Sequence, residues 1–393
     1  MLNQRMHELG AEPNKIRELF AYGLERKAQI GPENVYDYSI GNPSVPAPPE
    51  VLRQFEAQLA QDPVKVHEYT PSPGDAQVRQ AIAQHIRTNF DIPATFGNVY
   101  VTSGASSAIA ITLAAISNPG DEVIAIAPYF PEYKTWAQAA GCTLIEVPAL
   151  TPSFQPDIQA IEAAITPKTS AVIINSPNNP VGTVYTRTSL EALAEMLQRK
   201  EQELGTRIML ISDEPYREIV YGAEVPYVPS LYEDTIVCYS FSKSLSLPGE
   251  RIGYIYVSDL IPDAADISVA VAGAGRALGY ICAPVLLQRV VAECLAVPSD
   301  VATYEENRQI LTEGLAELGY EFVEPEGAFY LWVRALEPDA VAFSERAKEF
   351  ELLLVPSDSF GVQGWVRLSY CIAQKTIRDS FPAFKALKEA YEA

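Results

Sequence analysis

Short apolar runs alternate with helical stretches between residues 98 and 257, and this alternation constrains the fold more than any other feature of the sequence. The seven runs are Asn98–Thr102, Glu122–Ala127, Thr143–Val147, Ala171–Asn175, Ile208–Ser212, Thr235–Tyr239 and Ile252–Val257. Their continuous apolar character is typical of strands that are buried on both faces. Helical patterns such as 104–117 and 188–204 lie between them, and we place the start of the latter at a capping box of Thr188 and Glu191. This order predicts an α/β fold with a mostly parallel seven-stranded sheet sandwiched by helices.

The sequence changes character on both sides of this region. Residues 1–45 predict an N-terminal arm, with a helical face over residues 12–29, followed by a proline-rich passage at 41–49 that excludes helix and central strand. A long helical stretch and short strands after residue 285 predict a smaller α+β domain. We therefore expect an arm at 1–45 that joins the small domain and a dimer interface, a large domain at 46–285 and a small C-terminal domain at 286–393.

Charge and composition exclude several classes of function. The formal net charge of -21 argues against a nucleic acid or an anionic membrane as partner. No apolar stretch approaches the roughly 20 residues of a membrane helix, and the N-terminus lacks a signal-peptide core. The five cysteines show no C-x-x-C spacing, and the three histidines lie far apart. We expect a cytoplasmic protein with free thiols and without a metal site.

Chemically active residues follow several of the predicted strands, at the edge where ligands bind in an open α/β sheet. Ser103, Gly104 and Ala105 open a helix whose first N–H groups suit a phosphate, although small residues also serve tight packing. Asn179 lies in a loop that could equally be an ordinary turn. Asp213 follows a fully apolar run and needs a partner such as a cationic ring nitrogen, unless it is a helix N-cap.

Lys243 follows the sixth run beside Ser240 and Ser242, and Arg251 stands just before the seventh. The small hydroxyl groups can bind a phosphate, and Lys243 lies at the same end of the predicted sheet as Asp213. A solvated loop lysine and a surface ion pair are the ordinary alternatives.

The joint order of these residues resembles the fold-type-I pyridoxal-phosphate enzymes, and specifically the class I/II aminotransferase family. The resemblance covers almost the whole chain. The matching landmarks are Tyr69 with Gly74, Ser103–Ala105, Asn178–Gly182, Asp213 with Tyr216, Ser240–Lys243, Arg251 and Arg367. It implies pyridoxal 5'-phosphate as cofactor, and transfer of an amino group from an L-amino acid to a 2-oxo acid by a ping-pong mechanism.

The resemblance also implies a role for each matching residue. Lys243 would form a Schiff base with the cofactor and then shuttle a proton, and Asp213 would keep the ring nitrogen protonated. Asn179 and Tyr216 would bind the phenolic oxygen, and Phe130, with Tyr129 as the alternative, would stack on the ring. The phosphate would be bound by Ser103, Gly104, Ala105, Ser240, Ser242 and Arg251.

Three further residues are implied on the substrate side and at a subunit interface. Arg367 would bind the α-carboxylate in a bidentate pair, and Gly41 and Asn179 would line the substrate side. Tyr69 would reach the phosphate of the neighbouring subunit, so a homodimer is expected.

One departure from the family concerns the substrate. A subgroup of aspartate aminotransferases has a lysine in the phosphate-loop helix that binds a side-chain carboxylate, and Ser106 occupies that position here. Arg276 and Arg334 are candidates to substitute for it, and a structural or surface role is the ordinary alternative for each.

Two alternatives to transamination remain. A carbon–sulfur β-lyase of the cystathionine type shares the same scaffold and the same lysine, aspartate and arginine. A non-catalytic ligand sensor with an aminotransferase-like domain is more remote, because such regulators carry a DNA-binding domain that the first 45 residues do not suggest.

Overall fold

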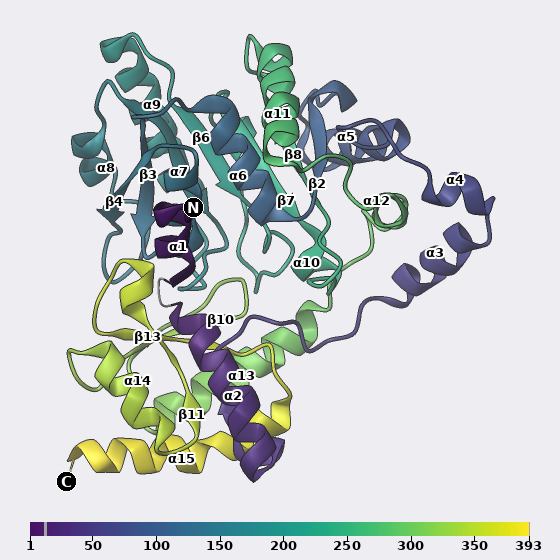
Figure 1. Cartoon of the computed structure of the whole chain (residues 1–393). Coiled ribbons are helices and arrows are strands. Elements are labelled where there is room, and N and C mark those ends of the chain that lie inside the picture. The colour runs from purple at the N-terminus through teal and green to yellow at the C-terminus, as the bar shows by residue number, and fades with distance from the viewer. Residues whose placement is uncertain (12–13, 393) are drawn as a thin grey trace.

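The computed structural model of this protein describes residues 1–11 and 14–392. A seven-stranded sheet forms the centre of the upper part of the molecule in Figure 1. The strand order is β2-β8-β7-β6-β5-β3-β4, with β8 antiparallel to both neighbours and all other pairs parallel. The strands are β2 (Val99–Thr102), β3 (Glu122–Ala127), β4 (Thr143–Pro148), β5 (Thr169–Asn175), β6 (Met209–Asp213), β7 (Thr235–Ser240) and β8 (Gly253–Val257). The predicted mostly parallel sheet is confirmed, and each predicted run contributes one strand.

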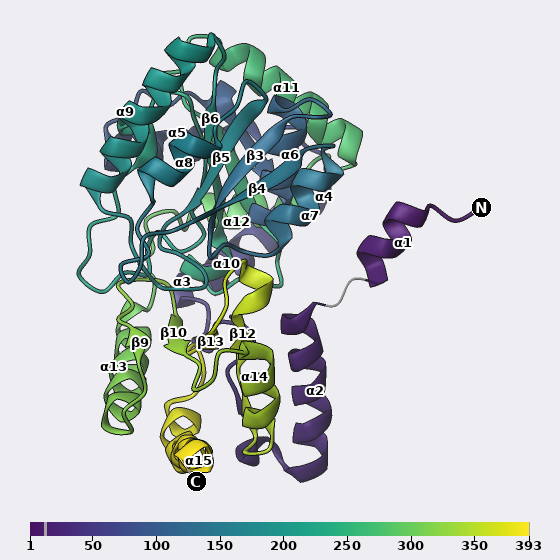
Figure 2. The same ribbon diagram turned by 90° about the vertical axis from the view of Figure 1, so that its left-hand side faces the viewer.

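Helices cover both faces of this sheet, which explains why its strands are apolar throughout. On β5, Ile173 faces one apolar cluster while Val172 and Ile174 face another. The helices are α5 (Ala76–Phe90), α6 (Ala105–Ile116), α7 (Glu132–Ala139), α8 (Ile158–Ala164), α9 (Arg187–Leu204), α10 (Phe241–Ser244), α11 (Ala264–Leu278) and α12 (Val285–Ala292). Helix α6 packs with α11 on one face, and α8 packs with α9 on the other (Figure 2).

The predicted capping box at the start of α9 is wrong. The N-cap is Thr186, whose side chain accepts a hydrogen bond from the N–H of Ser189 at 3.1 Å. The hydroxyls of the two residues also lie 2.8 Å apart. Thr186 and Ser189, two residues upstream of the predicted pair, therefore cap the helix, and Thr188 lies inside the first turn.

A second, antiparallel sheet in the order β12-β13-β10-β9 lies at the other end of the molecule. Its strands are β9 (Phe322–Val323), β10 (Tyr330–Arg334), β12 (Val355–Pro356) and β13 (Trp365–Ser369). The helices beside it are α13 (Val301–Glu317), α14 (Ala340–Lys348) and α15 (Gln374–Glu392). They enclose a separate apolar core, to which α15 contributes Ile377, Phe384 and Leu387. The sequence-based prediction had no counterpart of α15.

The N-terminal segment connects these two parts. Helix α2 (Lys15–Ile30) lies beside α14, where the Lys348 ammonium is 5.1 Å from the Tyr22 ring (Figure 2). The segment also includes α1 (Gln4–Ala11), β1 (Tyr36–Asp37), α3 (Pro49–Leu59) and α4 (Pro63–His67), and β1 pairs in parallel with β11 (Leu352–Leu353). Residues 12 and 13, the start of the predicted first helix, lie outside the described residues.

The proline-rich passage is free of helix and strand up to residue 48, and Pro49 then opens α3. Short 3-10 helices occupy Pro32–Asn34, Phe96–Asn98, Val228–Ser230 and Ser357–Phe360 (η1 to η4). No helix among residues 1–11 and 14–392 has both the length and the apolar character that crossing a membrane requires. The domain boundaries at residues 45 and 285 stay predictions.

Candidate active site

A cavity of about 490 Å³ lies at the carboxyl ends of β5, β6 and β7. It also receives residues from the N-terminal segment and from the second sheet. The predicted site residues that line it are Gly41, Ala105, Phe130, Asn179, Asp213, Tyr216, Ser240, Ser242, Lys243, Arg251 and Arg367. Residues that are far apart in the chain thus meet in one place, which the topology of an open α/β sheet predicts.

Asp213 ends β6 with a buried, half-satisfied carboxylate. The Tyr133 hydroxyl donates to Oδ2 at 2.5 Å, whereas Oδ1 is buried without a hydrogen-bond partner in the part of the chain that is described. Burial raises the pKa of Asp213 to about 7, the Tyr133 hydrogen bond opposes this shift, and the nearby Glu214 charge adds to it. A cationic N–H donor in the cavity would satisfy Oδ1 and restore the ionised form.

Lys243 lies on the single turn of α10, and its side chain is half-buried. The ammonium donates to the carbonyl oxygen of Gly41 at 2.6 Å. Burial lowers the pKa of Lys243 to about 8; nearby Cys371 opposes this shift, and the positive charge of Arg367 adds to it. A pKa of about 8 leaves roughly a tenth of the amine in the neutral, nucleophilic form at pH 7.

Several groups that can bind an anion lie where α6 begins. Gly104 is the N-cap with φ of +86°, and a Cβ there would lie 2.8 Å from Nη2 of Arg251. Arg251 Nη1 donates to Ser242 Oγ at 3.4 Å, and Ser240 Oγ donates to Ser242 Oγ at 2.8 Å. The glycine lets a guanidinium approach the free N–H groups of a helix start, and this combination suits a phosphate. Ala105 lines the cavity, whereas Ser103 and Gly104 do not.

Arg367 on β13 is a buried cation, only 2% exposed. Its Nη1 donates to Asn179 Oδ1 at 3.0 Å and its Nη2 to the carbonyl oxygen of Ser39 at 2.6 Å, while Nε has no partner among the described residues. The rings of Tyr330 and Phe360 lie 4.6 Å and 5.3 Å from the guanidinium carbon. Neither acceptor is charged, so this guanidinium is suited to bind an incoming carboxylate.

Three cavity-region residues escaped the sequence analysis. Asn175 donates to the carbonyl oxygen of Asp213 at 2.8 Å and accepts the N–H of Asn179 at 2.7 Å, and its pairing opposite Asp213 on β6 could have indicated this. Tyr133 and Tyr330 carry no local signal, because the fold alone brings them to the carboxylate and to Tyr216.

Tyr330 also explains why residue 41 is glycine. The hydroxyl groups of Tyr216 and Tyr330 lie 2.8 Å apart. A Cβ on Gly41 would come within 2.1 Å of the Tyr330 oxygen, so any side chain there would displace this tyrosine from the cavity.

Phe130 lines the cavity, whereas Tyr129 does not. The Phe130 ring packs edge-on against Tyr133, with 6.0 Å between ring centroids. This arrangement favours Phe130 over Tyr129 as the aromatic residue on the cavity wall.

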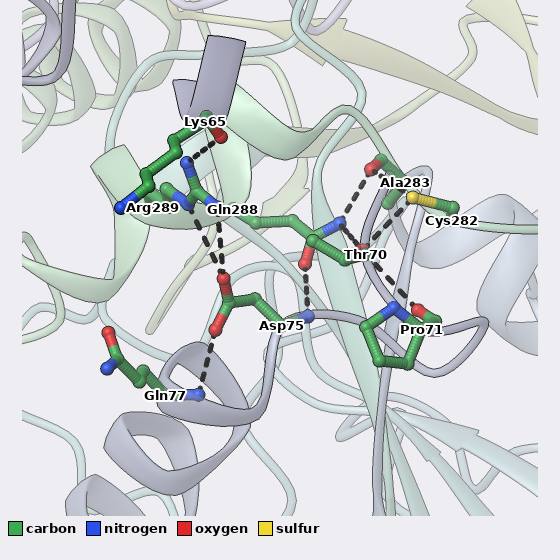
Figure 3. Close-up of polar contacts among 9 residues, drawn as sticks. All are labelled: Lys65, Thr70, Pro71, Asp75, Gln77, Cys282, Ala283, Gln288 and Arg289. Carbon is green, nitrogen blue, oxygen red and sulfur yellow. Dashed lines mark hydrogen bonds and ion pairs between the residues drawn. The ribbon is translucent and has the colours of Figure 1, made fainter. Parts of the chain in front are cut away.

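Tyr69 lies outside the cavity of its own chain and is 95% exposed. The loop that carries it is nonetheless held firmly (Figure 3). The buried Gln288 side chain donates to the carbonyl oxygen of Ala283 at 2.6 Å and accepts the N–H of Asp75 at 2.9 Å, and Thr70 Oγ1 lies 3.0 Å from Cys282 Sγ. An exposed tyrosine on a fixed loop is suited to contact a second molecule.

Ser106 lines the cavity, but neither Arg276 nor Arg334 does. Arg334 instead lies over the Trp365 ring at 5.1 Å, and Arg276 is exposed on α11. Arg17 also lines the cavity, and the sequence analysis did not consider it for this role.

The profile of the family described as "Aminotransferase class I and II" matches residues 33–380. The chain belongs to this aminotransferase family. An aspartate aminotransferase of Thermotoga maritima is 32% identical over 387 residues, which cover 97% of both chains. An aspartate/prephenate aminotransferase of Thermus thermophilus is 32% identical over 350 residues, which cover 88% of both.

Solved structures agree with this membership. An amino transferase from Eubacterium rectale superposes with a TM-score of 0.97 at 49% identity and covers 100% of both chains. The aspartate aminotransferase of Thermus thermophilus with maleate gives 0.87 at 29% identity, covering 98% of this chain and 99% of that one. This aminotransferase therefore has the expected fold, and transamination is its activity.

Proposed function

We propose that this aminotransferase uses pyridoxal 5'-phosphate to move an amino group from an L-amino acid to a 2-oxo acid by a ping-pong mechanism. The observation that carries the proposal is the meeting, in one cavity, of the half-satisfied carboxylate of Asp213 with the amine of Lys243. The aminotransferase names of the relatives favour this reaction over β-elimination and over ligand sensing.

The cavity residues fit the cofactor group by group. Asp213 Oδ1 would accept the ring N–H, and Lys243 would hold the cofactor covalently. Asn179 and Tyr216 would bind the phenolic oxygen, and Phe130 would stack on the ring. The phosphate would bind where α6 begins, against Ser103, Gly104, Ala105, Ser240, Ser242 and Arg251.

When bound, the cofactor supplies an electron acceptor for the carbanion at the substrate Cα, which no amino-acid side chain offers. Arg367 would bind the α-carboxylate in a bidentate pair and so fix the Cα–H bond in the cavity. The Lys243 amine would take the proton from Cα, and Gly41, which already accepts a hydrogen bond from this amine, would line the substrate side. Asp213 and Tyr216 would keep their contacts with the cofactor ring throughout.

We further propose that the enzyme is a homodimer in which Tyr69 reaches the phosphate of the neighbouring subunit. Val64 on α4 is exposed, and so are Tyr69, Tyr280 and Ile281. The Thr70–Cys282 contact places the loop of Tyr69 beside the loop of Tyr280 and Ile281. An exposed apolar surface of this kind is typical of an interface.

The five free cysteines support a reducing, cytoplasmic location. We retain the arm at 1–45, the large domain at 46–285 and the small domain at 286–393.

Covalent trapping tests the proposal. Protein reconstituted with the cofactor and reduced with borohydride should carry it on Lys243, as located by peptide mass mapping. The variant Lys243→Ala should stay folded, bind the cofactor without covalent attachment, and lose turnover. Replacement of the exposed Lys134 by alanine is the matched control. Label on another lysine, or full turnover of Lys243→Ala, would contradict the assignment.

Offering L-cystathionine separates transamination from β-elimination. The proposal predicts that no pyruvate or thiol is released when a 2-oxo acid acceptor is left out. Their release at a rate comparable to turnover with an amino donor would favour the lyase instead.

A further inference from the structure

Part of the cavity is lined by apolar side chains that the proposed function does not use. They are Ile16 on α2, Ile40 after β1, Ile109 on α6 and Trp136 on α7, and we call them the apolar wall. Ile16 packs on a cluster that includes Phe360, whose ring lies 5.3 Å from the Arg367 guanidinium. Trp136 lies 6.0 Å from the Phe130 ring. Ile16 thus connects the wall to the surroundings of Arg367, and Trp136 connects it to the aromatic residue on the cavity wall.

The charges around this wall do not suit a second carboxylate. Among residues 1–11 and 14–392, the cations that line the cavity are Arg17, Lys243, Arg251 and Arg367. The proposed function occupies the last three. Arg17 is already paired, because its Nη2 lies 3.3 Å from Oε1 of Glu132, and its side chain is 79% exposed.

Glu132 holds the negative charge at this side of the cavity. The same Oε1 also accepts a hydrogen bond from Asn14 Nδ2 at 3.2 Å. An acidic substrate side chain would therefore meet the carboxylate of Glu132 and an arginine that already contacts it. It would lose hydration without gaining an unpaired cation from the described residues of this chain. An apolar side chain would gain contact with the wall at no such cost.

We propose that the apolar wall and Glu132 select L-amino acids with uncharged, apolar side chains, aromatic ones included, over aspartate and glutamate. This inference rests on the proposed function, because it takes Arg367 as the site of the α-carboxylate. Glu132 acts as a specificity residue that excludes a second carboxylate.

Two measurements on the cofactor-loaded protein test the inference. Calorimetry should show that 3-phenylpropanoate, an unreactive monocarboxylate, binds about tenfold more tightly than succinate. A donor screen should give L-phenylalanine or L-leucine a kcat/KM about tenfold or more above that of L-aspartate and L-glutamate. Tighter binding of succinate, or a faster reaction of either acidic donor, would overturn the inference. If no donor reacts, the proposed function fails while the binding measurement still decides the substrate class.

Two substitutions test the residues themselves. Glu132→Gln removes the repelling charge and frees Arg17, so the preference for phenylalanine over aspartate should fall several-fold. Ser106→Lys adds a cation to the same cavity and should shift the preference in the same direction. Glu195→Gln makes the same charge change on the exposed face of α9 and should leave the ratio unchanged. An unchanged ratio in both cavity variants would overturn the role of this wall.

Discussion

At the scale of single residues, two buried ionisable groups distinguish this protein from an ordinary α/β scaffold. Asp213 and Arg367 are 5% and 2% exposed, and each retains a buried polar atom without a partner among the described residues. Burying such groups costs free energy unless a ligand completes them. Their place in one cavity indicates that the fold keeps both sites ready for charged ligand groups.

Asp213 should make the stability of the cofactor-free protein depend on pH. The folded pKa of Asp213 is about 7, above the ordinary value of 3.8 that applies to the unfolded chain. The protonated carboxyl therefore contributes fully to the free energy of unfolding below pH 3.8, and this contribution is lost as the pH rises through 7. We expect the wild type to lose about 1.4 kcal/mol per pH unit within this window relative to Asp213→Asn. Urea unfolding of both proteins at several pH values measures the difference. Parallel profiles would contradict the raised pKa.

At the scale of elements, the site depends on how closely β8 approaches the start of α6. A Cβ on Gly253 would lie 2.2 Å from the carbonyl oxygen of Tyr239 and 3.0 Å from the Cα of Gly104. Both contacts are to backbone, which cannot turn away as a side chain can. The predicted phosphate site is therefore built on a contact between two glycines in neighbouring elements.

Gly253→Ala should separate β8 from β7 and displace the start of α6. We expect the free energy of unfolding to fall by about 1–3 kcal/mol and the affinity for pyridoxal 5'-phosphate to fall with it. Gly249→Ala is the matched control, because a Cβ there meets nothing within 4 Å. Chemical denaturation and cofactor titration test this. A free energy of unfolding and a cofactor affinity equal to the wild type for Gly253→Ala would contradict the prediction, because they would show that the backbone moves aside at little cost.

Gln288 on α12 joins its helix to Ala283 and to Asp75 through side-chain hydrogen bonds. Its side chain is fully buried, so water cannot easily replace these bonds. Gln288→Leu would leave the N–H of Asp75 unsatisfied, and the carbonyl oxygen of Ala283 would keep only the weak Cys282 Sγ donor at 3.8 Å. We expect a loss of about 1–3 kcal/mol in the free energy of unfolding and faster hydrogen exchange over residues 69–75. Gln198→Leu, on the exposed face of α9, serves as control. Unchanged exchange would mean that other contacts hold this loop.

At the scale of the whole molecule, the cavity is assembled from segments that span most of the chain. Gly41 precedes the central sheet, Asp213 ends β6, Lys243 lies on α10 directly after β7, and Arg367 comes from the second sheet. The cavity therefore forms only when the parts that carry the two sheets are in contact. Tyr69 extends this dependence to a second copy of the chain in the proposed dimer.

Hybrid dimers test that dependence. Lys243→Ala and Tyr69→Ala should each have low activity alone, because each removes one group from every site. Mixed and allowed to exchange subunits, they should recover about a quarter of the wild-type activity, since the hybrid dimer contains one intact site. Sedimentation confirms that dimers form. Exchange without recovery would show that Tyr69 does not act across an interface.

The sequence by itself determined the class of fold and the edge where the chemistry lies. Apolar runs with both faces buried leave few alternatives to a covered parallel sheet, and residues such as Asp213, Asn179 and Lys243 follow those runs directly. Which side chains contact one another within the site was decided by the tertiary structure alone. Tyr133 and Tyr330 reach Asp213 and Tyr216 across 80 and 114 positions of the chain, and Arg17 reaches Glu132 across 115. Local sequence reports the conformation of a segment, whereas such pairings follow from how the segments pack.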